Sequence, residues 1–151
     1  GQVPNAIKSS KMIEVGKPEV LVKKEDSRVV VCASGSMVSS IHELIVEHEL
    51  SIDLVNMRFI KPIDKFEFSR LLEAKEVVVT AEEGIVYGGL YGAVSELMHE
   101  MKSDLALDCV GIKGDDFVEH GNREDLLKKL SMDKASVLYF LNSKIKGEVK
   151  F

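Results

Sequence analysis

Short apolar runs alternate along the chain with stretches in which apolar residues recur every three or four positions. The runs lie at residues 28–33, 52–59, 77–81 and 106–112. Continuous apolar runs of this length are typical of parallel strands that are buried on both faces. The stretches between and after them predict helices at residues 37–49, 64–74, 88–102, 125–130 and 134–143. The alternation predicts an α/β domain of three layers, with an open, mostly parallel sheet of about five strands flanked by helices.

The N-terminal part of the chain has a different character. Residues 1–10 are polar and irregular, which predicts a linker or a cut edge, and residues 11–151 are then one domain. Residues 11–15 and 19–23 alternate apolar and charged side chains around Gly16-Lys17-Pro18. This pattern favours a small exposed hairpin, or a pair of edge strands, beside the main sheet.

Composition and charge exclude several classes of function. The 151 residues carry a net charge of −5, which argues against a nucleic-acid partner because such surfaces need clustered Lys and Arg. The apolar runs are far too short to span a bilayer, and no secretory signal is visible. Cys32 and Cys109 both lie in strand-like runs and are expected to be buried free thiols, with a disulfide as the alternative. A cytoplasmic protein without membrane contacts is the expectation.

Two glycine-rich connections are candidate binding sites. Ser34, Gly35 and Ser36 stand between a predicted strand and a predicted helix, where backbone N–H groups could bind a phosphate. Neither G-x-G-x-x-G nor G-x-x-x-x-G-K-[ST] occurs there, so a plain turn with a helix cap is the alternative. Gly88 and Gly89 permit close approach of the backbone, either to a ligand or to a neighbouring helix or subunit.

Charged residues at the ends of the predicted strands are candidates for acid–base chemistry. Glu82 and Glu83 are paired acids, but adjacent strand residues point to opposite faces, so at most one of them can face a given site. His120 follows Glu119 in a predicted loop, where the pair could shuttle a proton or could fix the loop. The remaining histidines lack the spacing of metal ligands, and no metal site is predicted.

Three motifs together resemble the C-terminal domain of the transketolase superfamily. They are Arg58-Phe59-Ile60-Lys61-Pro62-Ile63-Asp64, Val79-Thr80-Ala81-Glu82-Glu83 with Gly88-Gly89, and Phe117-Val118-Glu119-His120-Gly121. The similarity runs from about residue 15 to residue 130 and keeps the order and spacing of all three motifs. Within the superfamily, the Glu-His-Gly triplet favours the 1-deoxy-D-xylulose-5-phosphate synthases over transketolase or the pyruvate dehydrogenase beta subunit.

The resemblance implies a reaction that this chain cannot perform alone. Such synthases use thiamine diphosphate and Mg²⁺ to condense pyruvate with glyceraldehyde 3-phosphate, for isoprenoid and thiamine biosynthesis. Their N-terminal domain carries a Gly-Asp-Gly motif for the metal, and their middle domain carries the glutamate that activates the cofactor. In this chain Gly114-Asp115 is followed by Asp116, so no catalytic residue and no bound cofactor are expected.

The implied partners are the N-terminal and middle domains of a parent synthase that forms a homodimer. The expected interface or rim residues are Arg58, Lys61, Pro62, Glu82, Glu83, Gly88, Gly89, Glu119, His120 and Gly121. A bulky residue at position 89 is then expected to weaken assembly and to leave the isolated fold mostly intact.

Two departures from the family pattern limit what the resemblance implies. The loop that begins Gly111-Ile112-Lys113-Gly114 lacks the family's proline and is one residue longer. The family's phosphate-binding arginine has no counterpart in residues 1–5, so no residue here receives that role. Two other readings stay open: part of a split transketolase or 2-oxo-acid dehydrogenase beta-type subunit, and a stand-alone anion-binding regulatory module.

Overall fold

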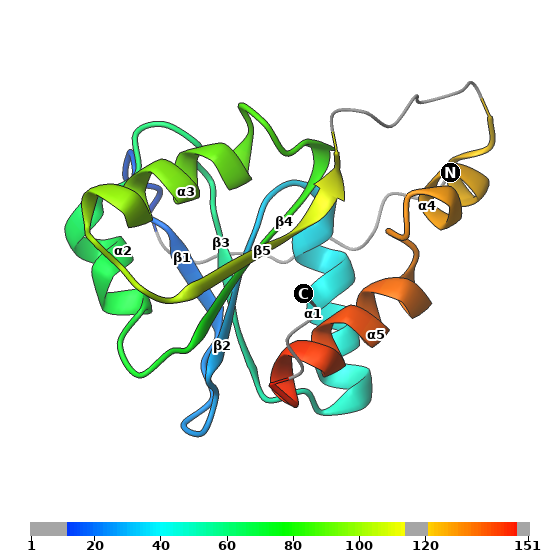
Figure 1. Cartoon of the computed structure of the whole chain (residues 1–151), viewed down its shortest axis with the longest axis horizontal. Helices are drawn as coiled ribbons and strands as arrows, with labels where there is room; N and C mark the ends of the chain where they lie inside the picture. The colour runs from blue at the N-terminus through cyan, green and yellow to red at the C-terminus, as the bar shows by residue number, and fades with distance from the viewer. Residues whose placement is uncertain (1–11, 114–120, 148–151) are drawn as a thin grey trace.

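A computed structural model describes residues 12–113 and 121–147 and confirms a three-layer α/β fold (Figure 1). The strands are β1 (Glu19–Val22), β2 (Val29–Ala33), β3 (Ile52–Asn56), β4 (Val77–Ile85) and β5 (Ala106–Ile112). The helices are α1 (Ser36–His48), α2 (Lys65–Leu71), α3 (Leu90–Glu100), α4 (Arg123–Lys129) and α5 (Lys134–Ile145). The strand order is β1-β3-β2-β4-β5, and all neighbours are parallel except β1, which runs antiparallel to β3.

The two faces of the sheet are covered by different helices. Val31 of β2 packs on one face with residues of α1 and α5, such as Ile41 and Leu141. Cys32 packs on the other face with residues of α2 and α3, such as Phe68. Successive strand residues point to opposite faces, so a strand with helices on both sides must be apolar throughout. All five residues of β2 are buried, which explains the continuous apolar run in the sequence.

The predicted edge hairpin is present only in its second arm. That arm forms β1, which pairs with β3 and not with residues 12–15, and those residues are in no strand. The turn at Gly16 packs instead against the loop before α2, because the N–H of Asp64 donates a 2.8 Å hydrogen bond to the carbonyl of Gly16. Gly16 has a φ of 81°, a conformation that glycine adopts without strain.

The starts of two predicted helices differ in how they are capped. Asp64 caps α2 as expected, since its carboxylate accepts a 2.9 Å hydrogen bond from the N–H of Glu67. The turn at residues 34–36 leads into α1 as predicted, but the cap residue is Gly35 and no side chain caps this helix. The cap expected of this turn is therefore present without a side-chain hydrogen bond.

A buried ion pair that the sequence did not predict lies at the amino end of the sheet. Lys75 Nζ is 2.8 Å from Asp53 Oδ2, and both side chains are only 3% exposed. Lys75 also donates a 2.6 Å hydrogen bond to the carbonyl of Ser27, and the N–H of Lys24 donates to Asp53 at 2.8 Å. The network joins β3 to the segments before β2 and β4, with both charges removed from water.

Helix α5 has a side-chain cap whose effect on stability should depend on pH. Asp133 accepts a 2.5 Å hydrogen bond from the Ser136 hydroxyl, and this bond holds the pKa of Asp133 below its ordinary value of 3.8. A carboxylate with a lowered pKa stabilises the fold above the unfolded pKa, and its contribution is lost as pH falls through the folded pKa. Asp133→Ala should therefore cost about 1 kcal/mol of unfolding free energy at pH 7.

Urea unfolding at pH 7 and at pH 3 or below measures this effect. The difference between Asp133→Ala and the natural chain should shrink at the lower pH. Asp104→Ala removes an exposed carboxylate that caps no helix and is the matched control. A difference that is the same at both pH values would show that the charge of Asp133 plays no part.

None of the helices in the described part of the chain is long and apolar enough to cross a membrane.

Candidate functional site: the carboxyl rim of the sheet

The predicted site residues of the described chain gather where the parallel strands end. Ala33 of β2 lies between Asn56 of β3 and Ala81 of β4. Two hydrogen bonds tie the outgoing loops together: the N–H of Ser34 donates to the carbonyl of Ala81 at 3.0 Å, and the N–H of Met57 donates to that of Ala33 at 2.8 Å. The carboxyl end of a parallel sheet is where α/β proteins usually place their functional residues.

Strand β4 departs from regular pairing at this rim. Ala81 pairs with Val110, but the next pair is Ile85 with Ile112, so four residues of β4 advance against two of β5. This bulge explains why β4 reaches residue 85, four residues beyond the prediction. It also turns the side chain of Glu82 inward, and Glu82 is 5% exposed.

Glu82 caps helix α3 from a distance of eight residues in the sequence. Its two carboxylate oxygens accept hydrogen bonds from the N–H groups of Leu90 at 3.0 Å and Tyr91 at 2.9 Å. The residue at the start of the helix, Gly89, has no side chain that could do this. A carboxylate at a helix N-terminus also interacts favourably with the helix dipole. Glu82 is thus engaged in the fold, and its buried carboxylate is not presented as a free acid or base.

Two glycines make room for this carboxylate. A Cβ atom on Gly89 would lie 2.1 Å from Glu82 Oε1 and 2.7 Å from the carbonyl oxygen of Ile85. A Cβ on Gly111 of β5 would lie 2.5 Å from Val86 Cγ1 and 3.3 Å from Glu82 Cγ. The expectation that a bulky residue at position 89 would leave the isolated fold intact is therefore wrong.

Glu83 points away from Glu82, as the alternation along a strand predicts. Its side chain is exposed and forms an ion pair with Arg123 at the start of α4. The pair links the last part of β4 to the start of α4. Gly121 is exposed just before α4, whereas Glu119 and His120 lie outside the described residues, so their proposed pairing stays a prediction.

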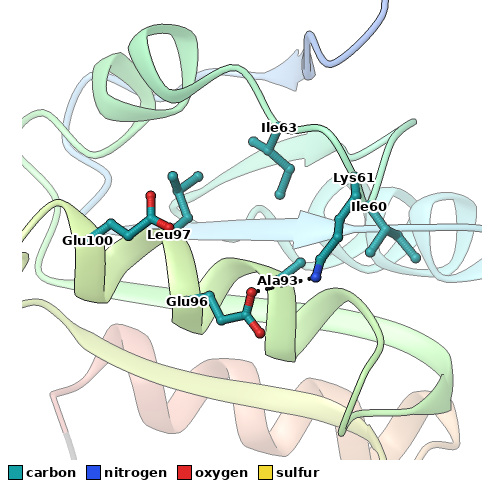
Figure 2. Close-up of a pocket in the computed structure, with 7 residues that line it drawn as sticks. All are labelled: Ile60, Lys61, Ile63, Ala93, Glu96, Leu97 and Glu100. Atoms are coloured by element: carbon teal, nitrogen blue, oxygen red, sulfur yellow. Dashed lines mark ion pairs between the residues drawn. The ribbon is translucent and has the colours of Figure 1, made fainter.

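The loop after β3 carries the other predicted rim residues. Arg58 pairs with Glu19 of β1, with Nη2 and Nε at 2.5 and 3.1 Å from the same carboxylate oxygen. Pro62 follows a cis peptide bond. Lys61 reaches toward α3, where its Nζ is 3.5 Å from Glu96, and both side chains are exposed (Figure 2).

Figure 2 shows a shallow groove between this loop and α3. Its volume is about 120 Å³. Ile60, Ile63 and Leu97 form apolar walls, and Glu96 and Glu100 stand along the helix. The ion pair of Lys61 with Glu96 crosses one part of the groove, so this space is small and already partly occupied by the protein's own side chains.

The turn at residues 34–36 borders a pocket of about 440 Å³ that Asn56 and Arg58 also line. The start of α1 at Gly35 has no side-chain cap, and the positive end of a helix favours anions. The guanidinium of Arg58 is already paired with Glu19. Anion binding at Ser34, Gly35 and Ser36 stays a prediction that these contacts neither require nor prevent.

A larger pocket, which the sequence did not indicate, lies between β5 and α5. It has a volume of about 720 Å³ and is lined by Asp108, Cys109, Phe140 and Lys144 among others. Lys144 pairs with Asp108 at 2.6 Å. Burial raises the pKa of the Cys109 thiol, so the thiolate is disfavoured near pH 7. This cysteine is free but only half-buried, in contrast to Cys32, whose pKa burial raises to about 12.

Metal binding finds no support within the described ranges. No three His, Cys, Asp or Glu side chains of residues 12–113 and 121–147 come together to hold an ion. The charged rim residues form contacts within the domain: Glu82 with α3, Glu83 with Arg123, and Arg58 with Glu19. These contacts suit a scaffold that presents a surface.

A comparison with protein families decides the relationship of this chain. Residues 18–137 match the family described as the transketolase, C-terminal domain. The chain belongs to this family. The matched range includes β1 to β5 and four of the five helices to their full length.

Curated relatives point to one branch of this family. A 1-deoxy-D-xylulose-5-phosphate synthase of Clostridium tetani is 30% identical over 135 residues, which is 87% of this chain and 21% of that protein. The synthase of Dictyoglomus thermophilum is 36% identical over 115 residues, or 74% of this chain and 18% of that protein. The chain thus spans about a fifth of the length of the curated relatives it matches.

A solved structure described as a split gene transketolase, an inactive beta4 tetramer, shares the fold. It matches 95% of this chain and 47% of its own chain, with a TM-score of 0.79 and 28% sequence identity. The transketolase of Campylobacter jejuni matches 85% of this chain with a TM-score of 0.60 and 21% identity, which shows the fold alone. The transketolase C-terminal fold predicted from the motifs is confirmed.

Proposed function

We propose that this transketolase C-terminal domain serves a thiamine diphosphate-dependent 1-deoxy-D-xylulose-5-phosphate synthase, as the part that packs against the cofactor-binding domains and supports the dimer. The observation that carries the proposal is the similarity to such synthases over 87% and 74% of this chain. The matched region is only about a fifth of each synthase, so the proposal assigns catalysis to the other four fifths.

The isolated domain should be inert. Thiamine diphosphate supplies carbanion stabilisation only when its diphosphate, its metal and an activating carboxylate are held together. The described residues offer no group of ligands for the metal, and the buried acid of the rim, Glu82, is bound to the start of α3. The cofactor and Mg²⁺ would therefore bind to other domains. A cytoplasmic location fits the free thiol of Cys32.

A second candidate rests on one specific comparison. The split gene transketolase has a TM-score of 0.79, against 0.60 for the Campylobacter jejuni transketolase, and is 28% identical over nearly all of this chain. A chain of this kind would function beside a separately encoded cofactor-binding polypeptide. Acceptance of xylulose 5-phosphate with an aldose phosphate, and no reaction with pyruvate, would favour a transketolase over a synthase.

Reconstitution tests the proposal. This chain is mixed with a separately expressed N-terminal portion of the parent synthase, and release of carbon dioxide from pyruvate with glyceraldehyde 3-phosphate is measured. Each component alone is the control. We expect activity in the mixture only. Turnover by this chain alone with cofactor and Mg²⁺ would contradict the prediction that the isolated domain is inactive.

A further inference from the structure

Segment 83–88, between the bulge of β4 and helix α3, exposes two large apolar side chains. Ile85 is 55% exposed and Tyr87 is 69% exposed. Val86, which lies between them, is 2% exposed and points into the protein. Two large apolar side chains exposed two positions apart are suited to an interface, since aromatic and apolar anchors supply much of the binding energy there.

This segment is held at both ends by hydrogen bonds to the rest of the domain. Val86 is fixed over β5, where its N–H donates to the carbonyl of Ile112 at 2.9 Å and Gly111 leaves room for its side chain. Beyond Tyr87, the buried Glu82 carboxylate holds the N–H groups of Leu90 and Tyr91, which fixes the start of α3. A segment fixed in this way loses little conformational freedom when a partner binds.

The backbone on either side of the two apolar side chains is accessible. A Cβ on Gly88 would contact nothing within 4 Å, and a Cβ on Gly84 would meet only Glu82 Oε1, at 3.9 Å. Gly84 precedes Ile85 and Gly88 follows Tyr87, so a partner can approach the backbone closely on either side of the two apolar anchors. Aromatic anchors with little conformational freedom are common at the centre of stable interfaces.

We propose that Glu82, Gly89 and Gly111 form a clamp that presents Ile85 and Tyr87 to the cofactor-binding part of a transketolase-type enzyme. Glu82 is then a positioning residue for assembly. The inference rests on the proposed function and adds the surface that makes the contact. The occupant is argued from chain length, because about four fifths of each curated relative lies outside the region that matches this domain.

The partner's surface should be apolar where it receives Ile85 and Tyr87, with a hydrogen-bond group for the tyrosine hydroxyl. Charge should contribute less, because the nearest exposed acid of the segment, Glu83, is already paired with Arg123. Association should accordingly depend only weakly on salt.

Alanine substitutions at the two anchors test the surface. Dissociation constants for the separately expressed cofactor-binding domains of the parent enzyme are measured with the full chain by titration calorimetry. Tyr87→Ala and Ile85→Ala should each weaken binding by about tenfold or more. Both side chains are exposed, so the melting temperature of the free chain should stay nearly unchanged.

Tyr139→Ala and Val46→Ala are the matched controls, because these side chains are 65% and 63% exposed on α5 and α1. They should alter binding by less than about twofold.

Anchor variants that bind like the natural chain would overturn the proposed surface and leave the proposed function intact. Absence of any complex with the natural chain would overturn both, and anchor variants that only abolish self-association would assign the surface to a second copy.

Glu82→Gln tests the clamp itself. The amide keeps the shape of the side chain but loses its charge, so the N–H groups of Leu90 and Tyr91 should exchange with solvent faster. Binding should weaken in proportion, and the loss should not add to that of Tyr87→Ala in the double variant. Fully additive losses would show that Glu82 stabilises α3 without positioning the segment.

Discussion

Lys75→Met should lower the free energy of unfolding by about 3 kcal/mol. The change leaves the carboxylate of Asp53 buried, because that side chain is only 3% exposed. Lys23, whose Nζ lies 3.4 Å from the same carboxylate, can replace part of the lost attraction. For this reason we expect a loss of unfolding free energy at the lower end of the range observed when buried ion pairs are broken.

Urea unfolding of three variants separates the buried charge from the loss of packing. Asp53→Asn with Lys75→Met removes both charges and should recover part of the stability lost in Lys75→Met. Lys61→Met breaks the exposed pair with Glu96 and should change stability by less than about 1 kcal/mol. Equal losses for Lys61→Met and Lys75→Met would contradict the account of the buried network.

Gly89→Ala should destabilise the isolated domain by about 3 kcal/mol, the sum of a lost helix cap and overpacking. The added Cβ would lie 2.1 Å from Glu82 Oε1, which must move and release its hydrogen bonds to α3. It would also lie 2.7 Å from the carbonyl oxygen of Ile85, a backbone atom that cannot rotate away.

Thermal or urea unfolding measures the effect of Gly89→Ala. Gly84→Ala is the matched control in the same segment, since its Cβ would meet Glu82 Oε1 only at 3.9 Å. It should change stability little. If the two variants are equally stable, the close approach at Gly89 does not matter to the fold, and the clamp loses its physical basis.

The central sheet could be predicted because its strands are apolar for a local reason. Residues 29–33 and 77–81 form nearly continuous valine-rich runs, and helices on both faces leave no solvent-facing position for a polar side chain. Asp64 was predictable as a cap for the same kind of reason, since its hydrogen-bond partner is three residues away.

Features that depend on distant parts of the chain could not be predicted in this way. Glu82 caps a helix that begins eight residues later, and Lys75 pairs with Asp53 across 22 positions. The run at residues 52–59 looked like one strand, but β3 ends at Asn56 because Arg58 turns to pair with Glu19. The first arm of the expected hairpin failed because its turn contacts the loop at Pro62 and Asp64.

Two features of the sequence indicate close contacts, one at the carboxyl rim and one at the amino end of the sheet. Gly111 lies inside a strand, where a glycine often marks the close approach of another segment. Asp53 is a charge within an otherwise buried run, and such a charge requires a partner. Both signals predict that a contact exists, although neither identifies the residue on the other side.

Reconstitution of carbon dioxide release is the most direct test of the proposed role. The purified chain is titrated into the separately expressed cofactor-binding domains of the parent synthase, with thiamine diphosphate, Mg²⁺, pyruvate and glyceraldehyde 3-phosphate present. The account predicts activity that rises with this chain, saturates at a fixed stoichiometry and is absent from either component alone. Turnover by this chain alone, or full activity of the cofactor-binding domains without it, would contradict the account.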